Sequence, residues 1–148
     1  MSNDIYDIVP LRISPLTHNL ELVRSYIARA MTSTLLTSGE QHGIVLAVDE
    51  ACANLMAHAV SMQPSHDIEV RVAVTPQDIV IEIRDVSEAF DPRTVEQPDM
   101  AVYFREMRSG GLGIALIRRV MDTIDYLPAS SETPFNRLIL RKRHRSAS

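Results

Sequence analysis

Apolar and polar residues alternate along two stretches in the middle of the chain, residues 68–74 and 79–83. Alternation places every second side chain on one face of a strand, and the segment between the two stretches contains proline and aspartate, which favour a turn. The pattern therefore predicts an antiparallel hairpin with one buried face. Similar but shorter patterns predict strands over residues 5–13, 125–128 and 136–142.

Apolar residues recur every three or four positions, as in a helix, over residues 17–36, 38–61 and 114–124. Thr37-Ser38-Gly39-Glu40 has the form S/T-x-x-E of a capping box, which predicts that the second helix begins there. A single helical turn is expected near Asp91-Pro92. Helices combined with antiparallel strands around one sheet predict an α+β fold, a two-layer sandwich.

The second predicted helix separates its side chains onto two faces. Its core face consists of apolar residues at helical spacing: Ile44, Val45, Val48, Cys52, Leu55, Met56 and Ala59. On the other face Glu50, Asn54 and His58 recur at every fourth position, flanked by the small residues Ala47, Ala57 and Ser61. A carboxylate suits general-base chemistry, and the amide oxygen of Asn54 suits a hard cation such as Mg²⁺. An exposed polar stripe with nothing bound is the alternative.

Three of the five glycines, Gly110, Gly111 and Gly113, lie almost side by side directly before the third predicted helix. Glycine permits close approach of the backbone to a ligand, and the N-terminus of a helix presents free amide groups to an anion such as phosphate. The sequence therefore predicts an anion-binding loop that leads into a helix. A flexible turn before a core helix is the alternative.

Composition limits the partners of the chain. Its 148 residues predict one domain, and its formal net charge of −4 argues against direct binding of nucleic acid. Cys52 is the only cysteine, which fits a reducing cytoplasm. No apolar run reaches the roughly 18 residues of a membrane span, and residues 1–10 lack the pattern of a signal peptide. We expect a cytoplasmic protein without a membrane partner.

Three motifs, in order, resemble those of the GHKL (histidine kinase-like) ATPase superfamily. The N-box, E-x-x-x-N-x-x-x-H-A, is matched by residues 50–59, and the G1 box, D-x-G-x-x-F-D-P, is resembled by residues 85–92. The G2 box is matched by residues 110–126, GGLGIALIRRVMDTIDY. In detail, this last motif, together with Asn136 further along the chain, is similar to the corresponding motif of the anti-sigma factor serine/threonine-protein kinases. The match covers about residues 38–142.

This resemblance implies a Bergerat-type ATP-binding fold with a mixed, mostly antiparallel sheet, in one domain over residues 1–148 that ends in a basic tail at residues 143–148. The cofactors would be ATP and Mg²⁺. Asp85 would accept a hydrogen bond from the adenine amino group, Asn54 would hold Mg²⁺, and Glu50 would polarise the hydroxyl of a serine on a partner protein.

The resemblance also implies further nucleotide-binding positions. The amides of Gly110, Gly111 and Gly113 would hold the phosphates, and the boxes add four neighbouring positions: His58, Ser87, Phe90 and Leu112. Residues 99–109 would form a lid over ATP, from which Arg105 or Arg108 would reach the γ-phosphate. Where the family usually has glycine close to the adenine, this chain has Ser87.

The implied function is that of an anti-sigma regulatory factor. Such a protein sequesters a sigma factor and, with ATP, phosphorylates a serine on an anti-sigma factor antagonist of the STAS type, and it is expected to be a homodimer. Two alternatives remain open at this point: a protein-binding module of the same fold that lacks kinase activity, favoured by Ser87, and the catalytic domain of a histidine kinase.

Overall fold

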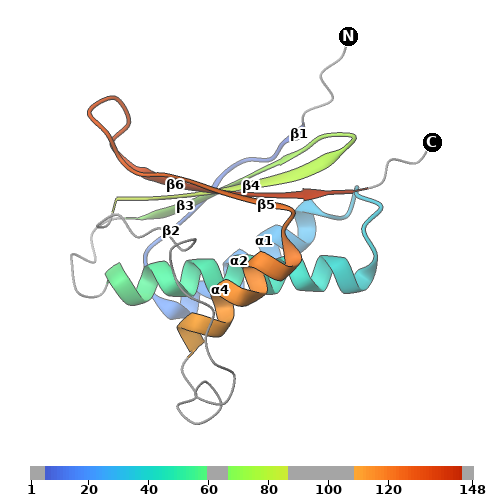
Figure 1. The fold of residues 1–148 in the computed structure, drawn as a ribbon, viewed down its shortest axis with the longest axis horizontal. Coiled ribbons are helices and arrows are strands. Elements are labelled where there is room, and N and C mark those ends of the chain that lie inside the picture. Colours follow the sequence, from blue (N-terminus) through green and yellow to red (C-terminus); the bar gives the residue numbers. More distant parts are fainter. Residues whose placement is uncertain (1–5, 60–66, 87–108, 145–148) are drawn as a thin grey trace.

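The protein forms two layers, a sheet and a layer of helices that covers one of its faces (Figure 1). This computed structural model describes residues 6–59, 67–86 and 109–144. The strands are β1 (Tyr6–Asp7), β2 (Leu11–Ile13), β3 (Ile68–Val74), β4 (Asp78–Asp85), β5 (Thr123–Leu127) and β6 (Asn136–Arg143). The helices are the short 3₁₀ helix η1 (Thr17–Asn19) and the α-helices α1 (Leu20–Ala30), α2 (Ser38–Ala59) and α4 (Ser109–Val120).

The strand order in the sheet is β1-β3-β4-β6-β5, and β2 also pairs with β3. Every pairing among the described strands is antiparallel. This arrangement confirms the predicted α+β class and the mostly antiparallel sheet. None of the helices in the described part of the chain is long and apolar enough to cross a membrane.

The predicted hairpin is formed by β3 and β4. Its turn is held by Thr75, whose amide donates to the carbonyl oxygen of Asp78 over 2.8 Å. The hydroxyl oxygen of Thr75 in turn accepts hydrogen bonds from the amides of Gln77 and Asp78. The side chain and the backbone of one residue thus close the turn together.

The predicted N-terminal strand is two short strands, β1 and β2, which both pair with β3. Pro10 lies between them and has no N–H group to donate to a neighbouring strand. The single strand expected over residues 5–13 was therefore wrong in its continuity, although the pairing residues fall within that range.

The first predicted helix ends six residues earlier than expected, at Ala30 rather than residue 36. The hydroxyl of Thr32 donates to the carbonyl oxygen of Arg29, and that of Thr34 donates to Met31. Such local bonds offer the backbone an alternative to continuing the helix. The second helix begins as predicted, because the amide of Glu40 donates to Thr37 Oγ1 and the amide of Thr37 donates to Glu40 Oε1, both over 3.1 Å.

The glycine-rich segment differs from the predicted loop before a helix. Gly110, Gly111 and Gly113 belong to α4, which begins at Ser109, so they are not a loop before the helix. The same helix ends at Val120, not near residue 124, because the chain joins the sheet at that point. The amide of Asp122 donates to the carbonyl oxygen of Arg141 over 2.9 Å, and β5 starts at the next residue.

The core lies between the inner face of the sheet and α1, α2 and α4. On β3 and β4 the side chains alternate strictly between buried and half-buried. Most of the core face predicted for α2 is buried, Val45 is half-buried, and the side chain of Ala59 lies outside the described residues. The buried face also includes Ala47, which had been expected to flank the polar stripe. Ala47 is small and fully buried, so it fills the core and leaves no room for a ligand there. Burial raises the pKa of the Cys52 thiol to about 12, which makes Cys52 an inert core residue.

Candidate functional site

The inner face of the sheet becomes polar at one end. The inward positions of β4 are Ile79, Ile81 and Ile83, and the next inward position is Asp85. Asn136 is paired directly opposite it on β6. Both polar residues are buried, with exposures of 7% for Asp85 and 1% for Asn136. The other inward positions of β4 and the other buried positions of β6 are aliphatic. These two polar residues interrupt an otherwise apolar inner face, so this end of the core is the strongest candidate for a site.

A small cavity of about 20 Å³ lies at this polar end. It brings together Asn54 of α2 and Asp85 of β4, the two predicted contacts to Mg²⁺ and adenine. The remaining lining residues come from α2, α4, β5 and β6: Ala51, Leu55, Ile117, Tyr126 and Leu138. Segments that carry the three motifs, far apart in the sequence, therefore meet at one cavity.

Glu50 lies one helical turn before Asn54 on α2 and is half-buried. Burial raises the pKa of its carboxyl group above the ordinary value, and the negative charge of Asp49 raises it further. Asp49 itself forms an ion pair with Arg24 over 2.7 Å. A carboxylate with a raised pKa is a stronger base, so Glu50 suits the acceptance of a proton from a hydroxyl.

The N-terminal end of α4 presents part of the predicted phosphate-binding segment. Gly110 and Gly111 lie in the first turn, where backbone amides have no partner within a helix. Gly113 is the fifth residue of α4, and regular helical geometry directs its amide to the carbonyl oxygen four residues before it. The amide of Gly113 is therefore less suited to phosphate than the sequence predicted.

Several predicted positions cannot be placed at the cavity. His58 belongs to the last turn of α2 and Leu112 to the first turns of α4. Ser87, Phe90 and Arg105 lie outside the described residues, as do Arg108, the turn at Asp91-Pro92 and most of the predicted lid.

The described residues fit a Mg²⁺ site in which the protein supplies few of the ligands. In this part of the chain no group of three or more histidine, cysteine, aspartate or glutamate side chains could enclose a metal. Asn54, which lines the cavity, would offer its amide oxygen as a single hard ligand. Mg²⁺ typically keeps several waters and takes one or two protein oxygens together with substrate phosphates, so one such ligand is sufficient.

Sequence reasoning gave no role to two polar residues of the site, although both belong to the motifs that resemble the family. Asn136 had been noted only as part of the resemblance, and its Oδ1 accepts a hydrogen bond from the amide of Ala129 over 2.8 Å. Tyr126 lines the cavity from β5. The alternation of Asn136 with Leu138 and Leu140 along β6 was the signal that could have placed Asn136 on the inner face.

Fold and site together are those of a histidine kinase-like ATPase domain. The model of the family with this description matches residues 13–142 of the chain. The match covers most of the chain, and the protein belongs to this family.

Several similar proteins are named as anti-sigma factors or serine-protein kinases, a narrower group than the family. The anti-sigma F factor of Oceanobacillus iheyensis is 24% identical over 80% of this chain and 82% of its own length. The serine-protein kinase RsbW of Bacillus subtilis is 22% identical over 80% of this chain and 76% of its own length. The serine/threonine-protein kinase BtrW of Bordetella bronchiseptica is 28% identical over 56% of this chain, and the match spans 58% of the relative.

A solved structure supports the fold. A chain in the crystal structure of the SiaB–SiaC complex from Pseudomonas aeruginosa matches with a TM-score of 0.64. The match covers 93% of this chain and 90% of that chain at 14% sequence identity. At this identity the likeness concerns the arrangement of the elements.

The raised pKa of Glu50 predicts a pH-dependent effect on stability. Above its ordinary pKa of 4.5, the carboxyl group ionises more readily in the unfolded chain than in the folded one, which destabilises the fold. The resulting loss of folding stability is absent below pH 4.5, grows as the pH rises, and reaches its full size above the raised pKa of Glu50. We expect Glu50→Gln to melt at a higher temperature than the wild type near pH 7, and the difference to vanish near pH 4.

Thermal denaturation followed by circular dichroism across this pH range measures the effect. A Glu50→Gln variant that melts below the wild type at neutral pH would contradict the assigned environment of Glu50.

Proposed function

We propose that this protein is an anti-sigma regulatory factor with ATP-dependent serine kinase activity. Its substrate is a serine on an anti-sigma factor antagonist of the STAS type, and it regulates transcription by sequestering a sigma factor. The observation that carries the proposal is the meeting of Asn54, Asp85 and helix α4 at one cavity. The names of the relatives supply the reaction and the partners.

Each described residue has a role that follows from its position. We assign to Asp85 the acceptance of a hydrogen bond from the amino group of adenine, because it is a buried acidic residue that lines the cavity. Asn54 holds Mg²⁺ through its amide oxygen, and the amides of Gly110 and Gly111 bind phosphate oxygens at the N-terminus of α4. ATP with Mg²⁺ supplies the phosphoryl group and neutralises its charge.

Glu50 is the proposed general base. Its half-buried carboxylate takes the proton from the hydroxyl group of the substrate serine, and its raised pKa brings it closer to the pH at which the reaction runs. The position of Glu50 one turn from Asn54 places the base on the same helix as the metal ligand. A single rigid element therefore orients both groups.

A binding module without phosphate transfer is the second candidate. Ser87 stands where the family usually has glycine, and its Cβ and hydroxyl group would approach the adenine. Such a protein would keep its sigma factor as partner and would bind nucleotide weakly. We place both candidates in the cytoplasm, as a single domain without direct contact to nucleic acid or membrane.

Nucleotide binding tests the site. We expect the wild type to bind ATP in the presence of Mg²⁺ and both Asp85→Asn and Asn54→Ala to lose binding, because each residue provides a contact that no neighbour replaces. Isothermal titration calorimetry with and without Mg²⁺ measures this, with Glu21→Gln on α1, a helix that does not line the cavity, as a matched control. Absence of heat and of a thermal shift with millimolar Mg-ATP would count against the site, and recovery in Ser87→Gly would identify Ser87 as the cause.

Phosphate transfer tests the role of Glu50. We expect Glu50→Gln to keep ATP affinity and sigma-factor binding yet to phosphorylate the antagonist about 10²- to 10⁴-fold more slowly, because the amide cannot take a proton. Labelled ATP and the purified antagonist provide the readout. An active variant would refute the assigned base, whereas an inactive wild type that retains its sigma factor would favour the binding module.

We also propose a homodimer that forms through the N-terminal strands and α1. A groove of about 490 Å³ lies between these elements and is mostly apolar. Val9 and Leu22 line it and are exposed. Burial of apolar side chains is the main driving force for association, so a second copy of the chain would cover this groove.

Light scattering tests the dimer. A protomer has a mass of 16.6 kDa, and we expect the wild type to scatter as twice that mass at micromolar concentration. Val9→Asp combined with Leu22→Asp should give the monomer, because a charge in a covered apolar groove is costly. Leu127→Asp on β5, which is also exposed, is the matched control and should stay dimeric. A monomeric wild type would overturn this part of the proposal.

A further inference from the structure

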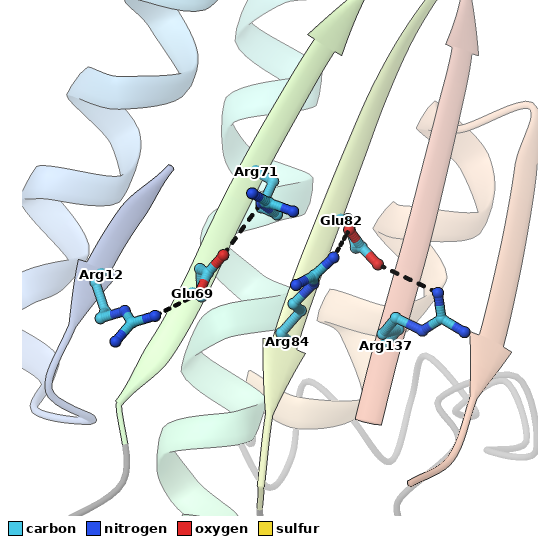
Figure 2. Close-up of polar contacts among 6 residues, drawn as sticks. All are labelled: Arg12, Glu69, Arg71, Glu82, Arg84 and Arg137. Carbon is cyan, nitrogen blue, oxygen red and sulfur yellow. Dashed lines mark hydrogen bonds and ion pairs between the residues drawn. The ribbon is translucent and has the colours of Figure 1, made fainter. Parts of the chain in front are cut away.

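The face of the sheet that points away from the helices carries a cluster of charged side chains (Figure 2). We call it the arginine face. It consists of four arginines and two glutamates from β2, β3, β4 and β6: Arg12, Arg71, Arg84, Arg137, Glu69 and Glu82. The helices lie behind the sheet in this view, so the cluster is separated by the sheet from the cavity that contains Asp85.

The positive charges of the arginine face lie outside the negative ones. The side chains of Glu69 and Glu82 are only 17% and 18% exposed, whereas those of the four arginines are between 23% and 70% exposed. Four arginines against two glutamates give the cluster a net charge of +2. The whole chain carries −4, so the remainder carries −6. Guanidinium groups therefore dominate the surface that a partner meets here, although the exposed Asp125 of β5, opposite Ile139, lies on the same face.

Arg84 and Arg137 form the centre of the cluster. They are directly opposite each other on β4 and β6, a position in which like charges destabilise a sheet. Both form ion pairs with one carboxylate, that of Glu82, over 3.1 Å for Arg84 and 3.9 Å for Arg137. Two cations thus share a single anion.

The two guanidinium groups also keep unused donors. The Nε atoms of Arg84 and Arg137 are buried and have no hydrogen-bond partner among the described residues. The guanidinium of Arg84 lies 4.5 Å from the centre of the Phe135 ring, which fixes its plane. A second carboxylate beside Glu82 would relieve the repulsion between the two cations.

We propose that the arginine face binds an acidic segment of a partner protein, with one carboxylate of that segment between Arg84 and Arg137. Apolar side chains on the same face favour a peptide over a nucleic acid. Leu127 is directly opposite Arg137 and exposed, and half-buried Ile139 is opposite Glu82. A segment that contains both acidic and apolar residues matches this surface, whereas a polyanion would meet the acidic remainder of the chain.

The size of the surface sets the length of a suitable probe. From β2 to β6 the arginine face crosses three strand intervals, about 14 Å at the usual strand spacing. An extended peptide of about ten residues spans more than 30 Å and covers this distance. The probe is a fluorescein-labelled oligo-glutamate peptide of that length, with an oligo-lysine peptide and a short DNA duplex of equal label as comparisons.

Fluorescence anisotropy at low and at high salt measures binding to the 148-residue chain. We expect the oligo-glutamate peptide to bind at low salt and to dissociate at high salt, whereas oligo-lysine, which the acidic remainder attracts, should bind the wild type and the Arg84→Gln/Arg137→Gln variant equally. The double variant Arg84→Gln/Arg137→Gln should bind the peptide about tenfold more weakly. The control Arg24→Gln/Arg119→Gln removes the same charge from the helical layer and should bind as the wild type does.

Glu82→Gln provides a test that a folding defect cannot imitate. It removes the carboxylate that Arg84 and Arg137 share, so the peptide should bind about threefold more tightly than to the wild type. Three results would overturn the proposal: absence of peptide binding to the wild type at low salt, equal weakening in the helical-layer control, and tighter binding of the DNA duplex than of the peptide.

Discussion

Side chains alternate along β3, β4 and β6, and every second residue enters the layer between the sheet and the helices. Because helices cover only one face, this alternation decides what each residue of these strands can do. Asp85 follows three inward isoleucines of β4 and is thereby inside the protein, whereas its neighbour Arg84 is on the opposite face. The cavity and the arginine face both follow from this single constraint of geometry.

Much of this organisation could be predicted from the sequence, because period-two alternation and the capping box are local signals. The hairpin, the start of α2 at Ser38 and the inward-facing core of α2 depend on neighbours close in the chain. The end of α4 at Val120 could not be predicted, because it depends on the hydrogen bond from the amide of Asp122 to Arg141, a residue of β6 that lies further along the sequence. The place of Asn136 opposite Asp85 likewise depends on the register between β4 and β6.

The charged and the apolar faces of the sheet contribute differently to stability. Inward aliphatic residues such as Ile81 and Val72 are removed from water, and burial of a side chain of this size is worth about 1.5–3 kcal/mol. Ion pairs at the surface typically contribute about 0–1 kcal/mol, since water and salt screen them. The arginine face therefore adds little to folding, and the fold does not require its particular arrangement of charges.

The register of β4 against β6 also limits how the chain can change in length during evolution. A single residue inserted within β4 before Arg84 would move Asp85 to the outer face and turn Arg84 into the core. Insertions of one residue are then tolerated in the segment between β5 and β6 or at the hairpin turn, but not within β4. We expect lineages that diverge from this sequence to differ in the lengths of their turns while the spacing from Ile79 to Asp85 stays constant.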